Sequence, residues 1–355
     1  MSGSPDPRGT SVEPMMHRAA RIEDAFHEFR ARRARKRGFL ATVVPYTGYG
    51  APTWARILGR VVLARDPRPG SRAERQHRKR EESIRGWRSF ISVPVSDVEV
   101  TIEIEGTTHP VRPDRGGVID TVIPVQLAPG WHTVKLYTAE STRVFEAPLY
   151  IVDPKAKFGI ISDVDDTVMV TALPRPLLAA WNTFVLDEHA RVPTPGMAVL
   201  LERLAGTHPG TPVVYLSTGA WNVAPTLTRF LSRNLFPAGP LLLTDWGPTH
   251  DRLFRSGLEH KRTNLLRLAE EFPGLKWLLI GDDGQHDESL YGEFAVAHPE
   301  NVAAVAIRQL SNGEAVFAGG RSKAEKHTSL SGAPWVYAPD GAGLSDQLRE
   351  LGILS

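Results

Sequence analysis

The order of apolar and polar positions divides the chain into three parts with different periods. In residues 16–37 apolar residues recur at helical spacing, which predicts an amphipathic helix ending at Gly38. Its apolar stripe consists of Ala19, Ile22, Phe26 and Phe29. Residues 1–15 are rich in Pro, Gly and Ser, and we expect them to be disordered. The first part, residues 1–38, is therefore predicted to be a leader with one helix.

From residue 39 to residue 154 the period changes to two, as in strands with one buried face. In the segment VEVTIEIEG every second residue is apolar, and several such segments are separated by turn-forming clusters such as PDRGG. Short strands at this spacing predict a small β-sandwich-like domain. Residues 66–90 interrupt the pattern as a basic insertion. No catalytic constellation occurs in residues 39–154, so we expect this domain to be a scaffold or a binding module.

In residues 155–355 nearly continuous apolar runs alternate with helical segments. FGII, VVYL, PLLLT and WLLIG are examples of the runs, and GMAVLLERLAG is an example of the helices. This alternation predicts an α/β domain in which helices cover both faces of a parallel sheet. Ligands bind outside the carboxyl ends of the strands in such sheets, so the residues that follow the apolar runs are the candidates for function.

Composition excludes several classes of protein. The 355 residues contain no cysteine, so disulfides and cysteine-ligated zinc are excluded. The first residues have no apolar signal-peptide core, and no run of about 18 apolar residues occurs. We therefore expect a cytoplasmic protein without a spanning helix, with peripheral contact at a membrane as an open alternative.

The charge is distributed unevenly although the net charge is only +2. Residues 1–90 contain 20 Lys and Arg against 9 Asp and Glu, whereas residues 91–355 contain 22 against 31. A basic front on an acidic body favours an anionic partner, either nucleic acid or anionic lipid, over a neutral one. A solvated leader, or a helix that packs on its own protein, explains the same pattern.

Polar residues from four distant segments follow the predicted strands or start a helix. They are Asp163, Asp165 and Asp166 in the first segment, Ser217 and Thr218 in the second, Lys261 at the start of a predicted helix, and Asp282, Asp283 and Asp287 in the last. The carboxyl ends of parallel strands meet at one edge of the sheet, so we expect these groups to lie together.

Clustered carboxylates accept hydrogen bonds but donate none, so they call for a cation. All-oxygen ligation suits Mg²⁺. A calcium-binding EF-hand loop is excluded because Thr167 and Val168 stand where that motif has Asp or Asn and then Gly. With a metal present, one aspartate can attack phosphorus while a second, two residues on, acts as general acid and then base. A hydroxyl and a lysine can hold the phosphoryl oxygens.

The motifs DVDDT, LST and GDDGQHD resemble those of the haloacid dehalogenase-like phosphatase superfamily, whose fold is Rossmann-like. The resemblance implies that Asp163 is the nucleophile and Asp165 the general acid and base. Ser217 matches the hydroxyl of the second motif and Lys261 the lysine of the third. An aspartate two residues after the nucleophile resembles the phosphatase branch of the superfamily.

In that superfamily the first aspartate binds Mg²⁺ through its side chain and the second through its backbone carbonyl. The metal ligands implied by the resemblance are therefore Asp163, Asp165 and Asp282. Asp287 is expected to support Asp282, and Thr167 and Asp283 are further supporting residues of the site. The only cofactor that the resemblance implies is Mg²⁺.

Residues 155–310 are similar, more narrowly, to the catalytic domain of actin-patch-protein-type phosphatidate phosphatases. GDDGQHDESLY is the most specific segment, whereas LSTGAW departs from the fungal pattern. The fungal relatives hydrolyse phosphatidate and diacylglycerol pyrophosphate with Mg²⁺.

Only about 28 residues separate Thr167 from the helix GMAVLLERLAG, too few for a full cap domain. An open site favours a large or surface-bound ester, and the apolar residues within 177–186 predict either a lip for acyl chains or ordinary helix packing.

The sequence thus predicts a Mg²⁺-dependent phosphatase that releases phosphate from a phosphatidate-like lipid through an aspartyl-phosphate. One alternative is the same chemistry on a soluble or macromolecular phosphate ester. Another is a binding module for anionic lipid or a partner, without catalysis. The expected partner is a phosphate-ester substrate, with contact to an anionic membrane and no nucleic acid.

Overall fold

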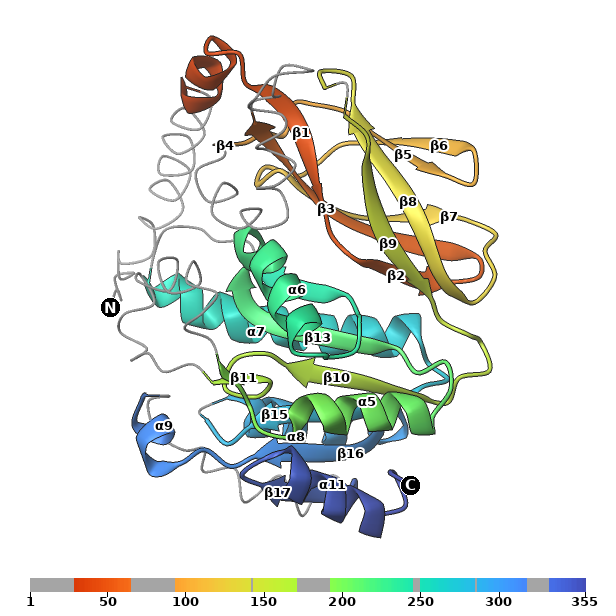
Figure 1. The fold of residues 1–355 in the computed structure, drawn as a ribbon, viewed down its shortest axis with the longest axis vertical. Coiled ribbons are helices and arrows are strands. Elements are labelled where there is room, and N and C mark those ends of the chain that lie inside the picture. Colours follow the sequence, from red (N-terminus) through yellow and green to blue (C-terminus); the bar gives the residue numbers. More distant parts are fainter. Residues whose placement is uncertain are drawn as a thin grey trace, which may run out of the picture.

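The computed structural model describes most of the two predicted domains and the end of the leader (Figure 1). The described residues are 29–64, 93–141, 143–170, 192–244, 250–284, 286–317 and 332–355. The predicted basic insertion at 66–90, most of the predicted helix at 16–37 and the residues of the predicted acyl-chain lip lie outside these ranges. The predictions about those segments stay predictions.

The described end of the leader is a helix over residues 29–35 that is held on the β-rich part. Ala31 is buried in the core of that part, whereas Phe29 is 60% exposed. Arg35 donates to Asp97 over 2.9 Å and to Glu140 over 3.1 Å. The chain leaves the helix at Gly38, whose φ of 77° is the left-handed conformation that glycine favours after a helix, so the predicted end is confirmed.

The β-rich part is one mostly antiparallel sheet (upper half of Figure 1). Its described strands are β1 (Leu40–Pro45), β2 (Gly48–Ala51), β3 (Trp54–Ala64), β4 (Val93–Pro94), β5 (Val100–Ile104), β6 (Thr107–Val111), β7 (Val118–Pro124), β8 (Gly130–Thr138) and β9 (Phe145–Ile151). The order is β1-β3-β2-β9-β8-β5-β6, and β4 and β7 pair with β3. Only the short β2–β9 pair is parallel among these. The prediction of a β-rich region is confirmed, and its strands join into one continuous sheet.

The alternation in the sequence corresponds to one buried face of this sheet. Val100, Ile102 and Ile104 of β5 are buried, while the residues between them are partly exposed. These residues share a core with Ile57 of β3 and Leu136 of β8, so the two halves of the curved sheet enclose one apolar interior. The alternation of apolar and polar residues in the sequence thus arises because one side of each strand is buried.

The second sheet is parallel, as predicted, and has six strands, of which the last, β17, was not predicted (lower half of Figure 1). Its strands are β10 (Phe158–Asp163), β13 (Val213–Ala220), β14 (Leu241–Thr244), β15 (Lys276–Asp282), β16 (Val302–Arg308) and β17 (Trp335–Ala338). The order β14-β13-β10-β15-β16-β17 is the 3-2-1-4-5-6 order of a Rossmann-like fold. The strands are almost completely buried because both faces are covered, which explains their continuous apolar runs.

Helices and short connections complete this α/β part. They are α5 (Met197–Thr207), η2 (Trp221–Val223), α6 (Ala224–Arg233), α7 (His250–Glu271), α8 (Asp287–Ala297), η3 (Pro299–Asn301), α9 (Asn312–Phe317) and α11 (Gly341–Glu350). The two-stranded ribbon of β11 (Met169–Val170) and β12 (Val192–Pro193) follows β10. Lys261 lies in the middle of α7, so the prediction that it begins a helix was wrong.

The two sheets are packed together through a common hydrophobic cluster. Tyr46, Tyr49 and Leu58 of the β-rich part belong to the same cluster as Phe272 and Trp277 of the α/β part. Aromatic rings meet across this boundary, with the Tyr49 and Phe272 centroids 6.1 Å apart. The β-rich part therefore packs against the α/β part through buried contacts.

Candidate active site

The predicted functional residues gather where the strand order reverses. In the 3-2-1-4-5-6 order this point lies between β10 and β15, which are neighbours with parallel register. Asp163 is the last residue of β10 and Asp282 the last of β15. Ser217 lies in β13, on the other side of β10. Crevices at such switch points are the usual ligand sites of open α/β sheets.

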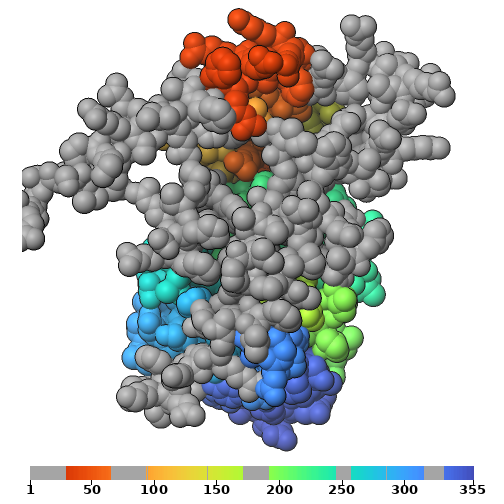
Figure 2. Space-filling view, turned by 90° about the vertical axis from the view of Figure 1, so that its left-hand side faces the viewer, coloured from red at the N-terminus to blue at the C-terminus, as the bar shows by residue number. Residues whose placement is uncertain are grey.

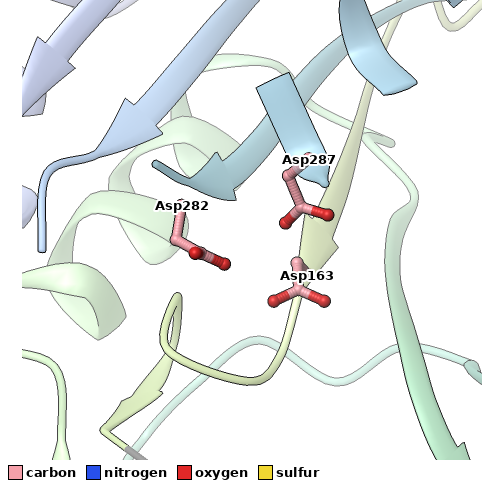
Figure 3. Close-up of side chains that lie close together, drawn as sticks. All are labelled: Asp163, Asp282 and Asp287. Atoms are coloured by element: carbon pink, nitrogen blue, oxygen red, sulfur yellow. The ribbon is translucent and has the colours of Figure 1, made fainter. Parts of the chain in front are cut away.

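Three carboxylates face one another at this point (Figure 3). Asp163, Asp282 and Asp287 each offer one oxygen, and these oxygens all lie within 4.8 Å of one another. All three residues are buried. Asp287 is the first residue of α8, so the approach of that helix to β15 brings it beside the two strand-end aspartates.

One lysine binds two of these carboxylates. Lys261 Nζ donates to Asp163 Oδ1 and to Asp287 Oδ1, each over 2.6 Å, and the lysine side chain is buried. Burial lowers the pKa of Lys261, but the charges of Asp163 and Asp287 outweigh it and raise that pKa well above its usual value. The lysine is therefore charged at neutral pH.

The carboxylates carry more negative charge than Lys261 can neutralise. Burial raises the pKa of Asp163 and of Asp282 well above the usual range, and the neighbouring carboxylates raise it further, while Lys261 opposes the shift. Asp287 Oδ2 is buried without a hydrogen-bond partner. Three buried carboxylates with one lysine have a net charge of −2 when ionised, so the residues present fit a divalent cation with a preference for oxygen ligands, such as Mg²⁺.

The side chain of Asp165 points to a different partner. Its Oδ2 accepts a hydrogen bond from Ser217 Oγ over 3.0 Å, and Ser217 Oγ in turn accepts from the backbone N–H of Gly219 over 2.9 Å. The Asp165 carboxylate is not part of the acidic cluster, where Asp287 stands instead. The structure thus brings Asp287, predicted only as a supporting residue, among the candidate side-chain ligands. The expected role of the Asp165 backbone carbonyl stays a prediction.

The loop between Asp163 and β11 is tightly folded. Asp166 has a φ of 58°, and its N–H donates to Met169 O over 2.8 Å. Arg308, the last residue of β16, donates from Nη1 to the carbonyl of Asp166 over 2.7 Å. Thr167 is completely buried in this turn. Sequence reasoning missed Arg308, although an arginine at the end of a buried apolar strand was a signal for it.

Asp283 has a structural position at the edge of the site. Its Oδ1 accepts from the backbone N–H of Leu310 over 2.8 Å, which joins the end of β15 to the chain after β16. Asp282 Oδ1 accepts from the N–H of Gly284 over 2.7 Å. The two adjacent aspartates therefore have different surroundings, since only Asp282 belongs to the acidic cluster.

A Rossmann-like sheet with these aspartates and a lysine at its switch point is the arrangement that the sequence motifs predicted. Residues 158–309 match the family model described as "Phosphatidate phosphatase APP1, catalytic domain". The predicted resemblance of this segment to the APP1-type catalytic domain is confirmed.

Two curated fungal proteins are similar to this chain. Phosphatidate phosphatase APP1 of Saccharomyces cerevisiae is 28% identical over 156 residues, which are 43% of this chain and 26% of that protein. An uncharacterized protein of Schizosaccharomyces pombe is 26% identical over 238 residues, which are 63% of this chain and 36% of that protein. The matches thus span about a quarter to a third of the length of these relatives.

Solved structures resemble the chain only distantly. The HAD domain of the effector protein Lem4 from Legionella pneumophila aligns with 50% of this chain and 93% of its own length, at 14% identity and a TM-score of 0.30. A carbohydrate acetylesterase from Xanthomonas citri aligns with 84% of this chain and 69% of its own, at 8% identity and a TM-score of 0.33.

Proposed function

We propose that this chain is a Mg²⁺-dependent phosphatase that releases inorganic phosphate from a phosphatidate-like lipid. The observation that carries the proposal is the acidic cluster of Asp163, Asp282 and Asp287 around Lys261, inside the segment that matches the APP1 catalytic-domain model. Clusters of buried carboxylates with raised pKa values are typical of catalytic sites, and the point where the strand order reverses is a usual place for such a site.

In the first step, an oxygen of Asp163 forms a bond to phosphorus and the diacylglycerol oxygen leaves. Lys261 holds Asp163 Oδ1, which orients Oδ2 for the attack. Asp165 gives its proton to the leaving oxygen, and its orientation is fixed by the hydrogen bond from Ser217. The product is diacylglycerol, and the phosphoryl group is on Asp163.

In the second step, Asp165 takes a proton from water, and the water oxygen attacks phosphorus. The bond between phosphorus and Asp163 breaks, which returns the carboxylate and releases inorganic phosphate. Asp163, Asp282 and Asp287 would hold the Mg²⁺, whose charge favours the ionised carboxylates and offsets the charge of the phosphoryl oxygens. Lys261 lies beside the reacting carboxylate and is the residue we assign to the phosphoryl oxygens, whereas the single proton of the Ser217 hydroxyl orients Asp165.

Two features support a lipid as the substrate. The family model and the budding-yeast relative both carry the name phosphatidate phosphatase. The short gap after Thr167 predicts a site without a full cap, which suits an ester held at a surface. The same chemistry on a soluble or macromolecular ester, and a binding role without turnover, are the alternatives that the experiment must separate.

The test is phosphate release from phosphatidate in mixed vesicles, measured beside a soluble phosphomonoester, with the wild type and the Asp163→Asn variant. We expect Mg²⁺-dependent release from vesicles by the wild type and none by the variant, because an amide cannot form the aspartyl-phosphate. EDTA should abolish the release. Preference for the soluble ester would favour the first alternative. Absence of turnover in a folded, Mg²⁺-loaded wild type would favour the binding module.

We also propose that the leader contacts an anionic membrane surface. Arg33 and Lys36 are exposed, beside the 60% exposed Phe29, and this helix lies at the far end of the molecule from β17 (Figures 1 and 2). No helix in the described ranges is long and apolar enough to cross a membrane. Phe29 and Arg33 lie on the helix and Lys36 in the turn that follows it, and cationic side chains beside an aromatic one favour binding at the lipid interface.

The Arg33→Gln/Lys36→Gln double variant tests the membrane proposal. Each cation near an anionic surface contributes about 1 kcal/mol, so the affinity for phosphatidate-containing vesicles should fall about thirtyfold at low salt. Turnover of a soluble ester should not change. Arg112→Gln, an exposed arginine of the β-rich part, is the matched control. Equal vesicle binding by all three proteins would contradict the proposal.

A further inference from the structure

We propose that Tyr46, a residue of the β-rich part, is a positioning residue for the Ser217–Asp165 pair of the active site. This inference rests on the proposed function, because it assigns a task to the β-rich part within the same phosphatase reaction. It gives that part, in which the sequence shows no catalytic constellation, a direct connection to the chemistry.

Tyr46 makes two contacts with the segment that follows β13. Its hydroxyl donates to the carbonyl of Trp221 over 2.9 Å. Its ring stacks on the Trp221 ring, with centroids 4.9 Å apart and planes 13° from parallel. Both side chains are buried, at 7% and 5% exposed. A hydrogen bond and a stacked ring together fix the position of the Trp221 backbone.

The backbone between Ser217 and Trp221 needs such support because it leaves the regular sheet. The pairing of β13 with β14 shifts register between Leu216 and Ala220. Where the backbone hydrogen bonds between β13 and β14 are interrupted, the Thr244 side chain takes their place. Its Oγ1 donates to Thr218 O over 3.0 Å and lies 3.2 Å from Gly219 O. Tyr46 supplies the corresponding hydrogen bond at the end of the interval, from outside the α/β part.

The position of this interval decides where the Ser217 hydroxyl lies. Ser217 Oγ is held by the N–H of Gly219 over 2.9 Å and donates to Asp165 Oδ2 over 3.0 Å. A shift of the backbone near Trp221 therefore moves the donor that orients Asp165. Displacements of this kind matter because proton transfer depends on hydrogen-bond distance and alignment.

Tyr46 can hold the Trp221 backbone in place because a second set of contacts fixes the β-rich part to α7. The Tyr49 hydroxyl donates to Glu271 Oε2 over 2.8 Å, and Arg56 donates to Glu271 and to Asp120. Arg267 donates to Asp120 over 2.9 Å. These contacts lie at the end of α7, ten residues beyond Lys261 and away from the Ser217 interval, so they provide a matched control.

The test compares Tyr46→Phe with Tyr49→Phe. Each variant removes one hydroxyl between the two parts and keeps the ring. For Tyr46→Phe we expect kcat on phosphatidate vesicles to fall about fivefold with KM unchanged. The pH profile of kcat should be displaced, and amide hydrogen exchange in residues 217–223 should become faster. Tyr49→Phe should change none of these three quantities, although both variants should lower the melting temperature.

Equal effects of the two variants on kcat, pH profile and exchange would overturn the inference and leave Tyr46 with a purely structural role. The exchange measurement does not depend on activity. If the wild type shows no phosphatase activity, the proposed function fails, and the exchange of residues 217–223 still decides whether Tyr46 positions Ser217. Unchanged exchange in Tyr46→Phe would overturn the inference in that case too.

Discussion

At the scale of single residues, the site holds three carboxylates and one lysine, and we expect Asp287 to affect both the affinity for Mg²⁺ and the stability of the metal-free protein. Asp287 accepts from Lys261 through Oδ1 while Oδ2 is buried without a partner. Asp287→Asn should raise the Mg²⁺ concentration for half-maximal activity about tenfold. It should also stabilise the metal-free protein, because one buried negative charge is removed. Titration of activity and melting temperature with Mg²⁺ checks both effects, and an unchanged Mg²⁺ dependence would exclude Asp287 as a ligand.

His260, the neighbour of Lys261 in α7, should make stability depend on pH. Burial lowers the pKa of His260 to about 4, below its usual 6.5. The unfolded chain therefore binds a proton at a higher pH than the folded chain, and stability is lost as pH falls from about 6.5 to 4. Between pH 7 and pH 5 the loss should be about 2 kcal/mol. Urea unfolding at both pH values should show this loss in the wild type and a smaller one in His260→Gln.

The same scale shows which residues the sequence could predict. Asp163 and Asp282 end apolar strands, so local pattern and the geometry of parallel sheets were sufficient to place them together. Arg308 also ends an apolar strand and was overlooked, whereas Tyr46 could not be found in this way, because its partner Trp221 lies 175 residues away in the other part of the protein. No period in the sequence reports a contact over that distance.

At the scale of elements, the close approach of α8 to β15 depends on Gly281. A Cβ at this position would lie 2.7 Å from Asp287 Oδ2 and 2.7 Å from Tyr291 Cε2. Gly281→Ala should therefore push α8 away, destabilise the fold by about 1–3 kcal/mol and raise the Mg²⁺ requirement. Gly206→Ala in α5 is the control, since a Cβ there meets no atom within 4 Å. Similar Mg²⁺ titrations for both variants would contradict this account of the packing.

Most strands and helices followed from periodicity, and the exceptions have physical reasons. β2 has the sequence GYGA, with two glycines and no alternation, and it is specified by pairing with β3 and β9. β6, TTHPV, is a partly exposed edge strand without a buried face. The first turns of α7 contain Gly257 within a mostly polar stretch, so the sequence placed the start of the helix ten residues too late. The predicted domain boundaries stay predictions.

At the scale of the whole molecule, Glu271 connects the two sheets. It accepts from Tyr49 and from Arg56, and both Arg56 and Glu271 are about 15% exposed. Glu271→Ala should lower the free energy of unfolding by about 3 kcal/mol, because Arg56 loses a buried partner. Glu293→Ala removes an exposed pair with Arg262 and should cost less than about 1 kcal/mol. Calorimetry should show one transition in each protein, and separate transitions for the two parts would contradict the shared core.

The shared core also has a consequence for synthesis on the ribosome. The hydrogen-bond partners of Tyr46 and Tyr49 in the α/β part, Trp221 and Glu271, lie 175 and 222 residues later in the chain. Trp221 and Glu271 lie 70 and 120 residues after Ile151, the last residue of β9, so at roughly 5–20 residues per second the completed β-rich part stays uncovered for about 4 to 24 seconds. During this interval a nascent chain presents apolar rings that the mature protein hides, and it should bind chaperones that recognise exposed aromatic surface.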